Sequence, residues 1–327
     1  MISADAASAA PQMPARCLDT TPHMETMVAV GPGVQLQVLD WGGKGKPDTM
    51  VLLTGLGDNA HIFDEFAFQF TDYFHVIGIT RRGYLPSSQP DDGYDVATRA
   101  LDDMKVLDTL GISKAVFVGH SIAASELSRI ATAYKDRVEK LVYLDAFDLA
   151  ERFKLPEVPG PPFIDADLNS LETFQAARAR LLAVRGPDPS ICLHVKFDPS
   201  GKILDSTTPD WVGEKVLDGV KAPANPAVNW ADIAAPRLGI FGLFSTETRQ
   251  SYYWYLSAAE KKTFDQNFKG IVEWQRAEIE RFRISNPKNP EPVVIELPPG
   301  TTHYIFINNE AFVVRTMRQF LLGTVGN

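Results

Sequence analysis

Short apolar runs alternate with longer amphipathic stretches over the first half of the chain. Apolar residues in short or alternating runs, bounded by Gly, Pro and Asp, predict strands, and apolar residues at helical spacing predict helices. Because strand and helix alternate, we expect right-handed crossovers and a mostly parallel sheet covered on both faces, an α/β fold. The predicted strands are 26–30, 34–40, 49–54, 74–80, 115–119 and 138–144, and the predicted helices are 61–70, 96–110 and 122–134.

The alternation stops after residue 144. A proline-rich stretch with four prolines between 156 and 162 follows, and then a helical pattern at 171–184 and broken segments around Trp211 and Trp230. Such a stretch is typical of an insertion rather than of further sheet.

The alternating pattern returns in the last third of the chain. Strands are predicted at 236–242 and 292–297, a long helix lies between them at about 258–282, and Asn308 or Asn309 would cap a final helix. The predicted organisation is a flexible head at 1–24, a core formed by 25–148 and 232–327, and a cap at 149–231.

Composition limits the classes of ligand. The 327 residues are 45% hydrophobic and 22% charged, which is typical of a soluble globular protein with a sizeable core. A net charge of −9 and the lack of a Lys/Arg stripe argue against nucleic acid, and no apolar run reaches the roughly 20 residues that span a bilayer. We therefore expect a small-molecule ligand, no nucleic acid and no membrane contact, and leave the oligomeric state open.

Ser121 lies between the predicted strand 115–119 and the predicted helix 122–134. A serine hydroxyl is a poor nucleophile, so its use needs a base, a group that orients the base, and donors for the oxyanion. On a parallel sheet such groups gather at the carboxyl ends of strands, where Ser121 is predicted to be. The simpler interpretation is a serine that caps a helix or packs its hydroxyl.

Four motifs, each at or after the end of a predicted strand, give the chain its resemblance to a known family. The chain resembles the α/β-hydrolase fold over about residues 25–325, as a capped serine esterase or lactonase-like member. The resemblance implies a mostly parallel eight-stranded sheet and a mainly helical cap after the sixth strand. The motifs are Leu53-Thr54-Gly55-Leu56-Gly57-Asp58, Thr80-Arg81-Arg82-Gly83-Tyr84, Gly119-His120-Ser121 and Thr302-His303-Tyr304.

The sequence departs from the family pattern at two points. Ala123 replaces the second glycine of the serine motif, and Thr54-Gly55 replaces the usual His-Gly of the oxyanion loop. Neither change removes a backbone amide, so the resemblance still implies the amides of Leu56 and Ile122 as oxyanion donors.

The resemblance implies that the base follows the last strand, and His303 is the histidine at that place. His120 flanks the nucleophile and is expected to orient the turn. The other four histidines are expected to be surface or packing residues. Gly55, His120 and Trp211 are the candidate substrate contacts, although cap aromatics such as Trp211 commonly fill a core instead.

The acid has three candidates. In most of the superfamily it follows the seventh strand, where Glu247 is the nearby carboxylate. A second arrangement takes the acid from the end of the sixth strand, where Asp145 and Asp148 lie. Asp145 comes directly off the strand and is our prediction, with Glu247 and Asp148 as alternatives.

These residues predict acyl transfer through an acyl-enzyme, and the resemblance implies a serine hydrolase that cleaves a carboxylic ester or lactone of a small, largely apolar substrate. The alternatives are hydrolysis of an amide or carbon–carbon bond on the same triad, and a hydrolase-like protein that binds without turnover. Epoxide hydrolase or dehalogenase chemistry is disfavoured because such members would carry Asp at position 121. No cofactor and no metal are expected, since the nucleotide-binding glycine motifs are incomplete.

The compartment is weakly constrained. Cys17 and Cys192 have no metal-ligand spacing, and they do not distinguish a disulfide from two thiols. The first 23 residues are rich in Ala, Ser and Pro and lack the regions of an intact signal peptide. They fit either the remnant of a cleaved signal or the tail of a cytoplasmic protein, and resemblance to capped hydrolases slightly favours a secreted or periplasmic location.

Overall fold

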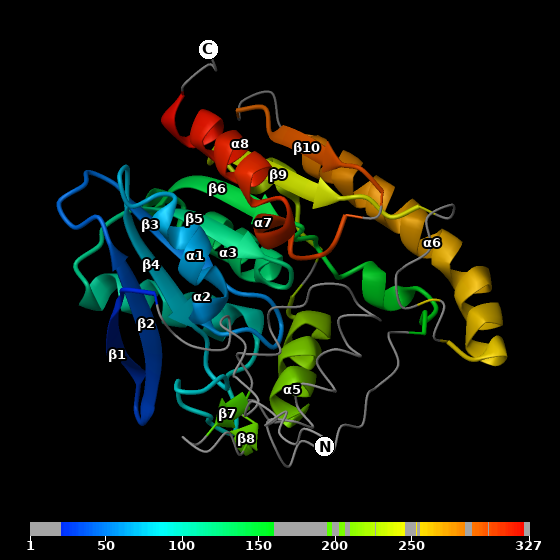
Figure 1. Cartoon of the computed structure of the whole chain (residues 1–327), viewed down its shortest axis with the longest axis horizontal. Coiled ribbons are helices and arrows are strands. Elements are labelled where there is room, and N and C mark those ends of the chain that lie inside the picture. Colours follow the sequence, from blue (N-terminus) through cyan, green and yellow to red (C-terminus); the bar gives the residue numbers. More distant parts are fainter. Residues whose placement is uncertain are drawn as a thin grey trace, which may run out of the picture.

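An eight-stranded, mostly parallel sheet forms the centre of the computed structural model (Figure 1). The strand order is β1-β2-β4-β3-β5-β6-β9-β10; β2 pairs antiparallel with β1 and β4, and the other strands pair in parallel. The predicted fold class is therefore confirmed. The strands are β1 (Met24–Gly31), β2 (Val34–Gly42), β3 (Thr49–Leu53), β4 (His75–Thr80), β5 (Ala115–His120), β6 (Val138–Leu144), β9 (Arg237–Gly242) and β10 (Val293–Leu297).

The structure describes residues 21–159, 195–197, 203–206, 210–225, 227–245, 253, 256–284, 290–299 and 301–323. Four features of the sequence analysis lie outside these residues. They are most of the head at 1–24, the two cysteines, the predicted helix 171–184 and Glu247.

Helices cover both faces of the sheet, because successive residues of each strand point to opposite faces. On β3, Val51 and Leu53 join the apolar cluster beneath α2, α3 and α6, whereas Met50 and Leu52 join the cluster beneath α1 and α8. Both faces are buried, so the strands are nearly continuous in apolar residues. The helices are α1 (Asp64–Phe68), α2 (Val96–Thr109), α3 (Ala123–Ala133), α5 (Asp210–Lys221), α6 (Ala258–Arg283), α7 (Ile305–Asn308) and α8 (Glu310–Leu322).

Several local predictions differ from the structure. The expected helix 61–70 is a 3₁₀ turn, η2 (Ala60–Phe63), followed by the short α1, because the side chain of Asn59 accepts from the His61 amide and starts the turn there. Asn309 occupies the N-cap position of α8 but makes no side-chain cap bond. Short α7 precedes α8, and a small antiparallel pair, β7 (Val195–Phe197) and β8 (Ile203–Ser206), lies within the predicted insertion.

The chain leaves the sheet at the end of β6 and re-enters it at the neighbouring β9. Helix α5 lies in the intervening stretch, and its residues Val212, Val216 and Val220 are buried in a cluster with Tyr84 and Ile122. The helix therefore packs against the residue that follows Ser121. We propose 149–231 as a cap on this basis. Within the described residues, no helix has the length and apolarity needed to cross a membrane.

Hydrogen bonds join the two ends of residues 149–231 to each other and to α6. The Val228 amide donates to Asp148 Oδ2 over 2.6 Å, and Arg281 of α6 donates to the Val228 carbonyl over 2.9 Å. Arg281 also pairs with Glu278, which is 3% exposed. Burial raises the pKa of Glu278 to about 7, although Arg281 acts in the opposite direction.

Glu278→Gln is expected to remove a pH dependence of stability. A raised pKa means that the folded protein holds the proton more tightly than the unfolded chain, so this stabilisation is complete below about pH 4.5 and lost as the pH rises through about 7. The free energy of unfolding should fall relative to the variant by on the order of 3 kcal/mol over this window. Melting temperatures measured from pH 5 to 8 test this, with exposed Glu280→Gln as the control. Parallel curves for Glu278→Gln and the unsubstituted protein would contradict it.

Candidate active site

Ser121 lies in a strained turn between β5 and α3. Its φ is 57°, in the left-handed region that few residues other than glycine adopt. The turn is also tightly packed, since a Cβ at Gly119 would lie 2.7 Å from Leu127 Cδ1 and 3.0 Å from Ala123 Cβ. Small residues are therefore required here, and alanine at 123, buried against Gly119, meets the requirement that a second glycine usually meets.

Three predicted residues form a continuous hydrogen-bonded row. His303 Nε2 lies 2.8 Å from Ser121 Oγ, and His303 Nδ1 lies 2.6 Å from Asp145 Oδ2. In the tautomer that satisfies both contacts, Nδ1–H donates to the carboxylate and Nε2 accepts from the serine hydroxyl. The His303 side chain is 49% exposed and that of Asp145 is 5% exposed, so the carboxylate is buried while the imidazole faces solvent.

Asp145 is held by the end of the adjacent strand β9. Its amide donates to the Ile240 carbonyl over 2.8 Å, and its Oδ1 accepts from the Gly242 amide over 2.9 Å. Its φ is 45°, which aspartate tolerates better than most residues and which turns the side chain back over the strand ends. Asp145 thus follows β6, while β9 contributes an amide that orients its carboxylate.

Asp148, the other candidate after β6, does not join this row, and Glu247 lies outside the described residues. The oxygens of Asp148 accept hydrogen bonds from the amides of Ala150 and Val228. Of the two aspartates after β6, Asp145 is therefore the one that bonds the imidazole of His303.

His120 lies beneath His303 rather than on the surface of the site. It is 1% exposed, its Nε2–H donates to the His303 carbonyl over 3.1 Å, and the two rings are 4.5 Å apart. Burial first, and then the neighbouring His303, lower the pKa of His120 well below its usual value, so it stays neutral. His120 therefore positions the backbone of His303, and its burial leaves it no surface for a substrate contact.

A second buried contact supports this layer. The Tyr304 hydroxyl donates to Asp58 Oδ1 over 3.3 Å, and Asp58 Oδ2 lies 3.8 Å from His120 Nδ1. Gly55 packs directly on this pair, because a Cβ there would lie 2.6 Å from the Asp58 carboxylate and 2.8 Å from His120 Nδ1. Glycine at 55 is thus explained by close packing.

The two predicted oxyanion donors lie on separate segments. Ile122 follows Ser121 and is 2% exposed, whereas Leu56 lies in the loop after β3 and is 36% exposed. No hydrogen bond joins either amide to another group within the described part of the chain. The next amide, that of Gly57, donates to the Tyr84 hydroxyl over 3.3 Å.

A buried ion pair, which the sequence analysis missed, holds the Leu56 loop. Arg81 donates to the Thr54 carbonyl over 2.8 Å and to the Gly55 carbonyl over 2.6 Å. The same guanidinium pairs with Glu126 of α3 over 2.8 Å. The loop after β3 is therefore fixed to the helix that begins after Ser121. A glutamate on the apolar face of α3 and the arginine after β4 were the signals that could have revealed it.

Both partners of this pair are ionised. Burial by itself would lower the pKa of Arg81, but Glu126 outweighs it and the net shift is upward. Burial likewise favours protonation of Glu126, but Arg81 and then Arg99, 3.6 Å away, hold its pKa below the usual value. A buried charge pair is retained only when hydrogen bonds satisfy both groups, as here.

Trp211, the remaining predicted contact, lies on α5. Its ring packs edge-on to Tyr94 at 5.9 Å, and Lys215 Nζ lies 5.0 Å from its centroid. It borders the cluster in which α5 covers Ile122. Its observed contacts are thus packing contacts between α5 and the core.

Known proteins share this fold and parts of this sequence. A 2-(acetamidomethylene)succinate hydrolase from Mesorhizobium japonicum is 30% identical over 163 residues, 50% of this chain and 58% of that protein. A non-heme chloroperoxidase from Streptomyces lividans is 32% identical over 165 residues, 48% of this chain and 55% of that protein. The match thus spans a little over half the length of these curated relatives.

The structural comparison extends the likeness over most of the chain. The crystal structure of an E-2-(acetamidomethylene)succinate hydrolase superposes with a TM-score of 0.62 at 18% identity, covering 92% of this chain and 99% of the other. At that identity the likeness concerns the fold. The model of a family described as "Alpha/beta hydrolase family" matches residues 50–316, well over half of the chain. On this match the chain belongs to the alpha/beta hydrolase family.

Proposed function

We propose that this protein is a serine hydrolase that cleaves a carboxylic ester or lactone through an acyl-enzyme. The observation that carries the proposal is the row Ser121–His303–Asp145, with contacts of 2.8 and 2.6 Å. Nucleophile, base and orienting acid at hydrogen-bond distance are the arrangement that activates a serine hydroxyl. Ser121 at the nucleophile position, where epoxide hydrolases would need Asp, supports acyl transfer.

Each group has one role in the proposed reaction. Ser121 Oγ bonds to the acyl carbon while its proton moves to His303 Nε2, and Asp145 stabilises the imidazolium that forms. The amides of Leu56 and Ile122 donate to the oxyanion. The intermediate then collapses and the alkoxide leaves with the proton from His303. Water next bonds to the acyl carbon and gives a proton to His303 Nε2, and the acid is released as the bond to Ser121 Oγ breaks and Oγ takes that proton back.

The surroundings of the row support a small, largely apolar substrate. The apolar face of α5 packs over Ile122, and Leu56 is 36% exposed.

Cleavage of an amide or a carbon–carbon bond uses the same groups, and a binding protein would retain them without turnover. Rates on p-nitrophenyl esters of graded chain length, several lactones and matched p-nitroanilides separate these activities. Absence of turnover on every substrate would contradict the proposal.

Ser121 is expected to be the residue that a fluorophosphonate labels. Ser121→Ala should lower ester turnover by roughly 10⁴- to 10⁶-fold, since triad members act as one unit. Mass spectrometry of the labelled protein locates the adduct. Ser125→Ala, one helical turn further on, is the matched control and should retain labelling at Ser121. An adduct on another serine of the folded protein would exclude Ser121 as the nucleophile.

Asp145→Asn is expected to lower kcat by roughly 10³- to 10⁴-fold without unfolding the protein, because the amide no longer holds the required His303 tautomer. Asp148→Asn and Glu247→Gln test the alternative acids and should keep kcat within a few-fold. Steady-state kinetics and thermal melts of the three variants decide the assignment. It fails if Asp145→Asn turns over normally while one of the other two does not.

Arg81→Met is expected to lower kcat by on the order of 10²-fold with little change in KM, because the Leu56 loop loses the guanidinium that binds two of its carbonyls. Arg81→Lys should recover part of the loss. Arg82→Met is the matched control, since Arg82 forms a buried pair with Asp102 at 2.7 Å but makes no recorded bond to the Leu56 loop. Equal loss of kcat in both methionine variants would show a general effect of destabilisation instead.

A further inference from the structure

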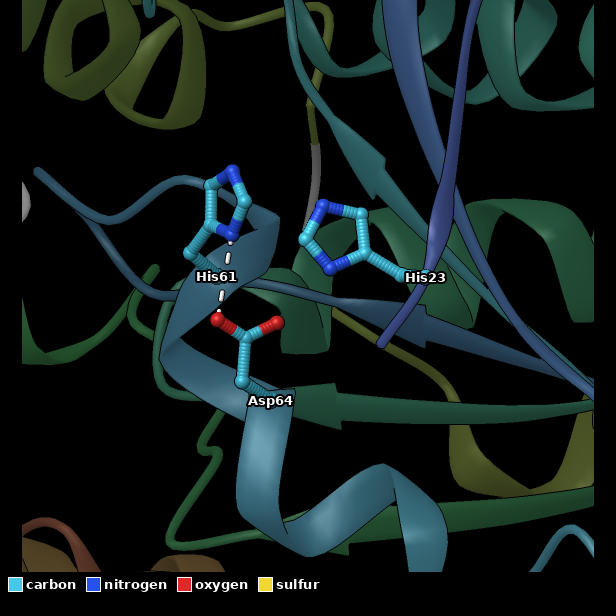
Figure 2. A group of neighbouring side chains, drawn as sticks. All are labelled: His23, His61 and Asp64. Carbon is cyan, nitrogen blue, oxygen red and sulfur yellow. Dashed lines mark hydrogen bonds and ion pairs between the residues drawn. The ribbon is translucent and has the colours of Figure 1, made fainter. Parts of the chain in front are cut away.

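Two histidines and an aspartate come together on the side of the core that carries η2 and α1. His61 in η2 and Asp64 at the start of α1 are three residues apart, and His61 Nδ1 lies 3.1 Å from Asp64 Oδ2. The ring of His23, just before β1, lies edge-on to that of His61 with centroids 5.0 Å apart. Figure 2 shows the three side chains turned toward one another from two separate segments.

The spacing of the three groups is close to that of metal ligands. One ligand atom from each residue lies within 4.8 Å of the others. Zinc bonds of about 2.0–2.2 Å in a tetrahedral site place ligand atoms about 3.3 Å apart. The His61–Asp64 pair, at 3.1 Å, is close to this separation, and a ring nitrogen of His23 lies within 4.8 Å of both. His61 and Asp64 are 18% and 15% exposed, so an ion can reach them from solvent.

Neighbouring polar groups orient two of the ligands. Trp41 Nε1 of β2 donates to Asp64 Oδ1 over 3.0 Å, which leaves Oδ2 toward His61. The side chain of Asn59 accepts from the His61 amide over 3.1 Å and fixes the start of η2. Contacts of this kind, from outside the ligand set, are what hold metal ligands in position.

We propose that His23, His61 and Asp64 bind one divalent transition-metal ion, with zinc as the ion that the ligand set favours. Two imidazoles and one carboxylate suit zinc and its neighbours, whereas calcium and magnesium prefer oxygen ligands throughout. Three protein ligands leave a fourth position for water. The ion would tie the entry to β1 to the turn that begins four residues after Leu56, a role separate from acyl transfer.

Metal titration of the untagged full chain tests the proposal. After treatment with a chelator, calorimetry with zinc chloride should give one ion per chain, and cobalt(II) should give the visible absorption of a low-coordinate site. Saturating zinc should raise the melting temperature by roughly 5 °C at a hundredfold excess over Kd. Cobalt(II) should also quench part of the tryptophan fluorescence, because Trp41, one of five tryptophans, bonds Asp64; the same titration of Trp41→Phe should lose this part.

Ligand variants assign the site. His23→Gln and His61→Gln should each weaken zinc binding by at least about 100-fold, because loss of a direct ligand costs more than loss of an orienting contact. His75→Gln is the matched control. His75 bonds the carboxylate of Asp40 at the same 3.1 Å but does not belong to the group of His23, His61 and Asp64. Its zinc affinity should be unchanged.

Three outcomes would overturn the proposal. They are no saturable zinc binding by the unsubstituted chain, binding that His23→Gln and His61→Gln leave intact, and equal weakening by His75→Gln. In each of these cases the contact between His61 and Asp64 would be an ordinary hydrogen bond within the first turn. Because none of these readouts uses ester turnover, the outcome is independent of the proposed hydrolase activity.

Discussion

The parallel, in-register pairing of β5, β6 and β9 is the constraint on which the rest of the site depends. His120 pairs with Leu144, and Leu144 pairs with Ile240, so β5 and β6 end at the same level and β9 continues for two more residues to Gly242. Ser121 and Asp145 therefore follow neighbouring strands at the same edge, where the Gly242 amide of β9 reaches Asp145. Backbone bonds at this edge join Ser121 to Leu144 and Asp145 to Ile240. A one-residue slip of β5 or β6 would turn Ser121 or Asp145 toward the opposite face of the sheet.

Two left-handed residues mark this edge. Ser121 and Asp145 are the non-glycine residues with positive φ in the described part of the chain. Each such conformation costs on the order of 1–3 kcal/mol and persists only where the surroundings impose it. Here the surroundings are the tight packing at Gly119 and the Gly242 amide on the carboxylate. The strain places a hydroxyl and a carboxylate on either side of one imidazole.

Polar side chains buried beside Ser121, His303 and Asp145 are satisfied in two different ways. Beneath His303 lies a buried neutral imidazole, His120, whose one N–H donates to the His303 carbonyl. Beneath the Leu56 loop the structure buries a full charge pair, Arg81 and Glu126, and satisfies it with two further carbonyls. Both arrangements fix backbone rather than presenting groups to a ligand. The fold hosts many chemistries, so such details, rather than the family, bear on what this chain does.

The sequence by itself determined the properties that depend on neighbouring residues. Apolar periodicity predicted every strand of the sheet and placed Ser121 at the end of one of them, and the resemblance to the α/β-hydrolase fold added His303 after the last strand. The break after residue 144 likewise predicted where the chain leaves the sheet. These features follow from local backbone preferences and from which face of an element is apolar.

Only the tertiary structure decided which partners meet across long separations. Asp145 and Asp148 carry the same side chain and are three residues apart, and the amide of Gly242, 97 residues away from Asp145, orients Asp145 toward His303. Arg81 and Glu126, 45 residues apart, and His23 and His61 are likewise paired by the packing of separate segments. His120, a candidate substrate contact from the sequence, is buried and bonds the His303 carbonyl instead. Such pairings are set by strand register and side-chain packing, which no local pattern encodes.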